Sequence, residues 1–122
     1  NYNCCQSVAC AYCDLLGIDE ETMFKAGEAF GLGMGGMEGT CGAIAGAVLL
    51  AGFKNSTANL EKPDSKASTY KLSAAILKAF EEKNGATLCH VIKGRDTGNV
   101  LRSCSGCIED AAQIAEDILN LK

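Results

Sequence analysis

Apolar residues recur at the spacing of α-helices along almost the whole chain. In the first segment, Val8, Ala11, Tyr12, Leu15 and Leu16 fall at helical intervals. The last segment carries a longer stripe of the same kind, made up of Ile108, Ala111, Ala112, Ala115, Ile118 and Leu119. Alternation with period two, which is typical of half-buried strands, nowhere persists for more than four residues. The pattern therefore predicts an all-α fold, a single-domain bundle of five to six helices.

Capping residues and glycines predict where these helices begin and end. Asp19, followed by two glutamates, is expected to cap one helix. Thr40 is expected to cap a helix of small residues over 41–52, and Ser68 a further helix that stops at an Asn-Gly pair. Residues 54–67 are polar and contain the only proline, so they are expected to form a surface loop.

Size and charge exclude several classes of partner. The chain has 122 residues and is expected to form one domain over 1–122. Its net charge is −4, and its basic residues form no stripe, so nucleic acid and anionic membrane surfaces are poor partners. The longest apolar run, Ala43 to Phe53, is far shorter than the ~20 residues that span a bilayer, so no membrane insertion is expected.

The N-terminus bears on the compartment. No export signal precedes Asn1, which favours a cytoplasmic location. The chain does not begin with methionine, so a removed leader is left open as an alternative.

Residues 31–46, GLGMGGMEGTCGAIAG, contain seven glycines and a single cysteine, Cys41. Glycine loops that lead into helices can bind phosphate, but this one lacks the G-K-[ST] sequence and a preceding strand. Glycines also let the backbone approach a bulky group closely. Two interpretations remain: tight packing against a neighbouring helix, or a loop that wraps a thiolate-bound cofactor, with Gly39 and Gly42 beside the ligand Cys41.

Eight cysteines are more than a chain of this length needs to fold. Four of them lie at or just before predicted helix N-termini: Cys4, Cys41, Cys89 and Cys104. The unpaired N–H groups and the dipole of a helix start favour a thiolate, but by only about 0.2–1.5 pKa units, which leaves the thiol partly ionised near pH 7. Several converging thiolates would also repel one another, and a metal, an iron–sulfur cluster or disulfide pairing would remove that repulsion.

Two cysteine pairs have C-x-x-C spacing, which suits a redox dithiol or half of a thiolate metal site. Cys10 and Cys13 are expected within a helix, where cysteine commonly serves as a small apolar residue. Cys104 and Cys107 are kept as a secondary redox pair. His90, the only histidine, is interpreted as a solvated side chain rather than a ligand.

The motif CGAIAG at 41–46 resembles the CGAxxG motif of small bacterial and archaeal proteins called the C_GCAxxG_C_C family of redox-active proteins. The resemblance extends over NCCQSV at 3–8, CHVIKG at 89–94 and CSGCIEDAAQIAEDIL at 104–119. The four cysteines of the family pattern would fall on Cys4, Cys41, Cys89 and Cys104. The resemblance implies redox chemistry without a defined reaction, and Cys5, Cys10, Cys13 and Cys107 are additional to the pattern.

Three functional hypotheses follow. The first is a redox protein whose Cys4, Cys41, Cys89 and Cys104 hold an iron–sulfur cluster or another thiolate-bound metal, for electron transfer to a redox partner protein or for redox sensing. The second is a thiol–disulfide redox protein without metal. The third is a binding module stapled by disulfides. No Ser/His/Asp set and no paired-carboxylate motif is recognisable, so no enzymatic activity is assigned. The small-residue helix over 41–52 could equally face a second subunit of a homo-oligomer.

Overall fold

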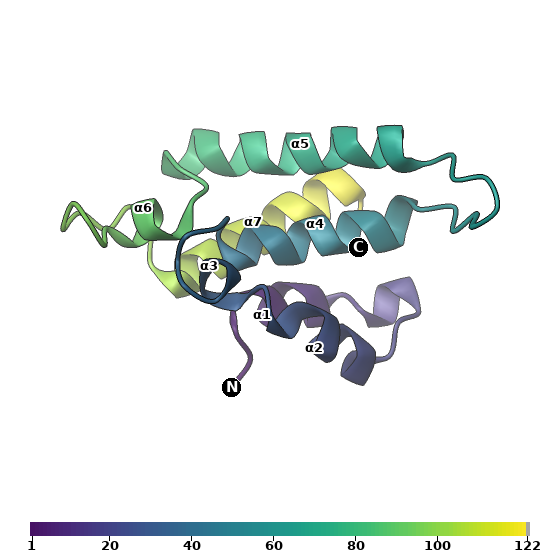
Figure 1. Cartoon of the computed structure of the whole chain (residues 1–122), viewed down its shortest axis with the longest axis horizontal. Helices are drawn as coiled ribbons and strands as arrows, with labels where there is room; N and C mark the ends of the chain where they lie inside the picture. Colours follow the sequence, from purple (N-terminus) through teal and green to yellow (C-terminus); the bar gives the residue numbers. More distant parts are fainter. Residues whose placement is uncertain (122) are drawn as a thin grey trace.

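A computed structural model describes residues 1–121, and almost all of its regular structure is helical (Figure 1). The elements in chain order are α1 (Cys4–Ala11), the 3₁₀ turn η1 (Asp14–Leu16), α2 (Glu20–Glu28), α3 (Gly31–Met34), α4 (Gly42–Asn55), α5 (Lys66–Asn84), α6 (Cys89–Lys93) and α7 (Cys104–Leu119). In α3, a single turn, Leu32 and Gly33 have left-handed backbone angles. Apart from α3 and η1 there are six helices and no strand within residues 1–121, so the prediction of an all-α bundle of five to six helices is confirmed.

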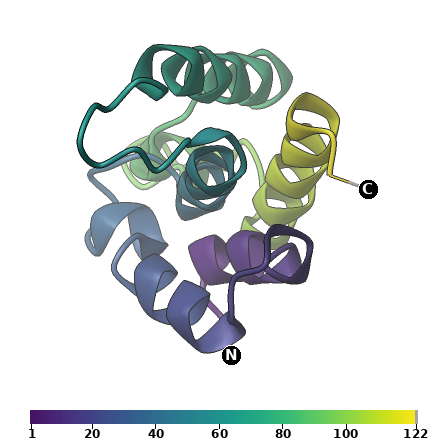
Figure 2. The same cartoon turned by 90° about the vertical axis from the view of Figure 1, so that its right-hand side faces the viewer.

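Helix α4 lies at the centre of the bundle, with the other long helices around it (Figure 2). Its small residues explain this position: a Cβ atom on Gly46 would lie 2.7 Å from the carbonyl oxygen of Cys5 on α1. The absence of that atom lets the two helices cross in close contact. One hydrophobic core surrounds α4, and its largest fully buried side chains include Phe80, Met23 and Ile44.

The helix starts agree only in part with the expected caps. Asp19 caps α2 as predicted and accepts a hydrogen bond from the N–H of Thr22 at 3.0 Å. The predicted cap Thr40 is wrong, because the N-cap of α4 is Cys41, whose N–H donates to the carbonyl of Thr87 at 2.8 Å. The predicted cap Ser68 is also wrong, because α5 begins earlier, at Lys66, with Ser65 as its N-cap.

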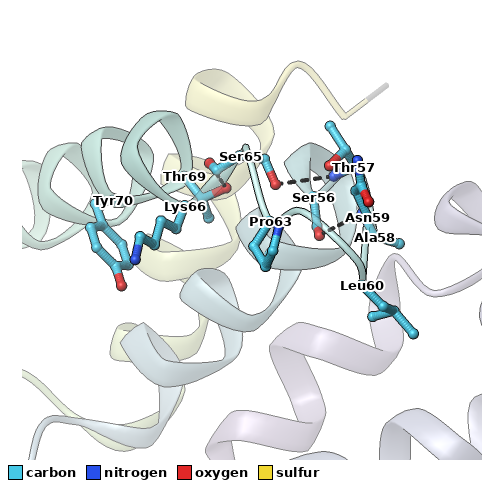
Figure 3. Close-up of a pocket in the computed structure, with 11 residues that line it drawn as sticks. Ser56, Thr57, Ala58, Asn59, Leu60, Pro63, Ser65, Lys66, Thr69 and Tyr70 are labelled. Atoms are coloured by element: carbon cyan, nitrogen blue, oxygen red, sulfur yellow. Dashed lines mark hydrogen bonds between the residues drawn. The ribbon is translucent and has the colours of Figure 1, made fainter.

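The loop between α4 and α5 is therefore shorter than expected and covers residues 56–65 (Figure 3). Its bend is held locally: the N–H of Thr57 donates to the Ser65 hydroxyl and that of Ala58 to the Ser56 hydroxyl, both at 3.1 Å. A surface pocket of about 400 Å³ lies against this loop and the first turn of α5, and no cysteine lines it.

A buried carboxylate holds the first half of α7 against the end of α5. Asp110 is 3% exposed and accepts hydrogen bonds from Lys83 at 2.8 Å, from Arg102 at 3.0 Å and from Asn84 at 3.1 Å. Burial alone would raise the pKa of Asp110, but these donors outweigh it and hold that pKa below its usual value. The network fixes the helical segment from which Cys107 projects.

None of the helices within residues 1–121 is long and apolar enough to span a membrane.

Candidate functional site

A cavity of about 310 Å³ lies where several helices of the bundle begin. These starts lie toward the left-hand side of Figure 1, where α6 flanks the first turns of α4 and α7. Five cysteines from four helix starts line the cavity: Cys4, Cys41, Cys89, Cys104 and Cys107. The structure thus brings together the four expected ligand cysteines and Cys107, which the sequence analysis kept with Cys104 as a secondary redox pair.

Local structure at each helix start places these side chains. Cys4 is the first residue of α1 and follows the cap Asn3, whose side chain accepts from the N–H of Gln6 at 2.8 Å. Cys104 is the first residue of α7 and follows the cap Ser103, whose hydroxyl accepts from the N–H of Gly106 at 3.1 Å. Cysteine is a less common N-cap residue than asparagine or serine. In α4, however, Cys41 itself is the N-cap.

The glycine-rich segment packs directly against these cysteines. A Cβ atom on Gly42 would lie 3.1 Å from Sγ of Cys4, and one on Gly33 would lie 2.4 Å from Cβ of Cys89. Gly33 also has a φ of +55°, a conformation that side chains disfavour. Close approach to the cysteines therefore accounts for these glycines.

Of the two glycines expected at the site, only Gly42 lines the cavity. Gly39 lies outside the lining and acts through its backbone, because its carbonyl accepts a hydrogen bond from the N–H of Cys89 at 3.0 Å. Gly39 thereby positions the first turn of α6 and the Cys89 side chain.

Burial differs sharply among the five cavity cysteines. Cys41, Cys89 and Cys107 are 3%, 2% and 1% exposed, whereas Cys104 is exposed and Cys4 is half-buried. A small molecule can reach the buried thiols only through the cavity, while a protein surface can contact Cys104 directly.

Cys41 and Cys107 form a buried pair in the lining of the cavity. The neighbouring Cys107 thiol is the largest of the effects that lower the pKa of Cys41. Burial opposes the shift, but the N–H groups of Ala43 and Ile44 and the charge of Lys93 add to it. The pKa of Cys107 is raised in turn, because it holds its proton toward Cys41 and is buried. The pair thus combines a thiolate with a neighbouring protonated thiol.

Four other cysteines are buried, and their burial makes them harder to ionise. Burial raises the pKa of Cys5 to about 12, and it also raises the pKa values of Cys10, Cys13 and Cys89. Cys10 and Cys13 belong to the hydrophobic core, and the Cys13 thiol donates to the carbonyl of Cys10 at 3.1 Å. Their placement agrees with their interpretation as small core residues.

A metal site is not shown by this arrangement. Among residues 1–121, no group of three or more His, Cys, Asp or Glu side chains is disposed to hold a metal ion. The expected cluster stays a prediction, and its four expected ligands line one cavity. All eight cysteines are free thiols, so no disulfide staple is present either.

His90 differs from its expected role, and Lys93 had no expected role. His90 is not fully solvated: its Nδ1 lies 3.1 Å from the carbonyl oxygen of Met37. Lys93 lines the cavity and was not singled out by the sequence analysis. The sequence could have indicated this position, because Lys93 follows Cys89 by four residues. Residues with this spacing lie on the same face of a helix.

Comparison with known proteins gives one result. The family described as "Putative redox-active protein (C_GCAxxG_C_C)" matches residues 2–118 of the chain. No curated protein and no solved structure matches the chain significantly.

Proposed function

The chain belongs to the C_GCAxxG_C_C family of redox-active proteins, and from this premise we propose that it is a thiol–disulfide redox protein whose working pair is Cys41 and Cys107. One observation carries the proposal: the buried Cys41 and Cys107 line the same cavity, which opens to solvent, and the neighbouring Cys107 thiol lowers the pKa of Cys41. A thiolate next to a protonated thiol is the arrangement that dithiol reductants require.

The reaction that this pair supports is the reduction of a disulfide. The Cys41 thiolate attacks one sulfur of a substrate disulfide R–S–S–R′, which forms a Cys41–S–S–R mixed disulfide and releases R′S⁻. The Cys107 sulfur then attacks Cys41, the Cys41–Cys107 disulfide forms, and RS⁻ leaves with the proton that Cys107 gives up. Both electrons that reduce the substrate come from the protein dithiol, and the first leaving thiolate, R′S⁻, takes a proton from solvent.

Cys104 gives the buried pair a connection to the surface. It shares the first turn of α7 with Cys107 and is exposed, whereas Cys41 is buried. Attack of the Cys104 thiolate on Cys107 moves the disulfide to Cys104–Cys107 and regenerates the Cys41 thiolate, with no net transfer of electrons. A redox partner protein can then reduce the exposed disulfide. In this route, the Cys104–Cys107 disulfide is the one that the redox partner protein reduces.

Peptide mapping after oxidation tests the proposal. The purified protein is titrated with an excess of a small disulfide, quenched with acid, and digested without reduction. We expect a Cys41–Cys107 or Cys104–Cys107 linkage and two electrons transferred per chain. Cys107→Ser should stop at the Cys41 mixed disulfide, while Cys10→Ser, in the core, serves as the control and should still form the linkage. Failure of Cys41 to form any mixed disulfide would overturn the proposal.

A separate preparation, purified without oxygen, tests the cluster that the sequence led us to expect. Four cysteines from four helix starts line one cavity, and this observation favours a cluster even though they are not drawn together into a metal site. A cluster would supply one-electron transfer to a redox partner. Iron and acid-labile sulfide in protein purified without oxygen, lost in both Cys41→Ser and Cys104→Ser, would support the cluster over the dithiol.

A further inference from the structure

The charge balance of the cysteine cavity is unusual. Lys93 is the one lysine or arginine among its lining residues, and no aspartate or glutamate lines it. Within residues 1–121, no carboxylate lies within ion-pairing distance of the Lys93 ammonium. Lysine side chains that are partly buried without a counter-ion are disfavoured. The cavity therefore contains a cation that no carboxylate neutralises, and the groups left to balance it are a cavity thiolate, a bound anion or solvent.

The position of Lys93 is fixed by the backbone around it. Lys93 is the last residue of α6, and Gly94 ends the helix in the left-handed conformation with its N–H bonded to the carbonyl of Val91 at 3.2 Å. A Cβ on Gly94 would lie 2.6 Å from the carbonyl of Asn99, so this turn is tightly packed. Because Lys93 follows Cys89 by one helical turn, both side chains reach the same cavity.

In the reduced protein the Cys41 thiolate can balance the charge of Lys93. The lysine is one of the groups that favour this thiolate, and its field also acts on Cys89 and Cys107. When Cys41 forms a mixed disulfide, its negative charge leaves with the departing thiolate. Lys93 then has no counter-ion in the cavity unless the bound half of the substrate carries one.

We propose that the cavity binds small disulfides that carry a carboxylate or a similar anionic group, and that Lys93 holds this group while the substrate is joined to Cys41. The inference rests on the proposed function and names its substrate class. The cavity volume of about 310 Å³ is at the lower end of the range for small-molecule pockets, roughly 300–1,000 Å³, so it fits a small thiol rather than a peptide. The lysine selects among substrates and takes no part in bond breaking.

Three disulfides with the same two-carbon arms provide the test: 3,3′-dithiodipropionate is anionic, bis(2-hydroxyethyl) disulfide is neutral, and cystamine is cationic. Rates of mixed-disulfide formation at Cys41 are measured by acid quench and mass spectrometry, in the Cys107→Ser protein so that the adduct persists. Each rate is divided by the rate of a model thiol with the same disulfide. We expect the anionic probe to react about tenfold faster than the neutral one and the cationic probe to be slowest.

Variants of Lys93 separate charge from structure. In Lys93→Gln the ratio of anionic to neutral rates should fall close to one, and Lys93→Arg should retain most of the preference. The ratio within one variant cancels any change in the thiolate fraction of Cys41. Lys54→Gln, on the exposed end of α4, removes the same charge from the chain and should leave the ratio unchanged. Added salt should reduce the preference in the wild-type cavity.

The outcomes distinguish this inference from the proposed function. If the three probes modify Cys41 at equal normalised rates, or if Lys93→Gln keeps the preference, the assignment of Lys93 is overturned while the thiol–disulfide function stands. If no probe forms a mixed disulfide with Cys41, the proposed function fails and the inference fails with it.

Discussion

Cys41 illustrates how the reactivity of a single residue depends on groups from other elements. Its helix start supplies the N–H groups of Ala43 and Ile44, but the largest contribution comes from Cys107 on α7, and Lys93 on α6 adds a positive charge. A helix end alone is worth roughly 0.3–1 kcal/mol, which lowers a thiol pKa by less than one unit. A larger decrease in the pKa of Cys41 therefore requires the contact between α4 and α7.

The contact between Cys41 and Cys107 predicts a specific pH dependence. We expect the rate of alkylation of Cys41 by iodoacetamide to rise with a midpoint clearly below the ordinary cysteine value of about 8.5. Cys107→Ala removes the neighbouring thiol that lowers the pKa of Cys41 and should move the midpoint upward, whereas Cys107→Ser keeps a polar O–H there and should move it less. Peptide mass spectrometry measures the alkylation of Cys41 separately from that of the other thiols. An unchanged midpoint in Cys107→Ala would contradict this account.

The sequence predicted some of these residue-level features and not others. Cys4, Cys41, Cys89 and Cys104 could be grouped because each begins a helix, which is a local property of the chain. The proximity of Cys107 to Cys41 could not be predicted in this way, because it depends on how α7 packs against α4. Gly39 was expected at the site because it lies two residues before Cys41 in sequence. Only the structure shows that its carbonyl accepts a hydrogen bond from the N–H of Cys89.

At the scale of elements, α4 depends on which of its positions lack a side chain. Gly46 faces α1, where a Cβ would lie 2.7 Å from the Cys5 carbonyl oxygen and 3.0 Å from Cβ of Val8. Gly52 lies near the other end of the same helix, and a Cβ there would have no neighbour within 4 Å. The two glycines therefore have different roles in one helix.

This difference predicts opposite effects of the same substitution. Gly46→Ala should lower the free energy of unfolding by about 1–2 kcal/mol, because overpacking between α1 and α4 outweighs the better helix propensity of alanine. Gly52→Ala should raise it by up to about 1 kcal/mol, because only the propensity changes. Urea unfolding followed by circular dichroism measures both. Equal changes of the same sign would show that helix packing does not require Gly46.

Element boundaries were less predictable than the elements themselves. Thr40 has the side chain of a good cap, yet it pairs with Leu88 in an isolated bridge and α4 begins one residue later. This bridge joins the glycine-rich segment to the N-cap residue of α6, and it forms between residues far apart in sequence. Local capping preferences cannot include such a contact, so the stripe of apolar residues predicted the helices while tertiary contacts determined where they start.

At the scale of the whole molecule, the thiols whose pKa values are shifted respond to pH in two opposite ways. Cys41 has a folded pKa below its unfolded value, so its thiolate contributes stability that is present above about pH 8.5 and is lost as the pH falls through the folded pKa. Cys5, Cys10, Cys13 and Cys89 have folded pKa values above the unfolded one. Their contribution is present below about pH 8.5 and is lost as the pH rises toward the folded values.

Cys5 provides the clearest test of the alkaline side, because burial raises its pKa to about 12 and its side chain is fully buried beside α2. Between about pH 9 and pH 12, a thiol that is neutral when folded and ionised when unfolded should lower the free energy of unfolding by ~1.4 kcal/mol per pH unit. We therefore expect Cys5→Ala to flatten the fall in stability by about that slope, measured by urea unfolding at several pH values with a reductant present. Val8→Ala removes neighbouring buried atoms of α1 without removing a thiol, so it should lower stability at every pH and keep the wild-type slope. A Cys5→Ala protein with the wild-type slope would mean that Cys5 ionises in the folded protein as readily as in the unfolded chain.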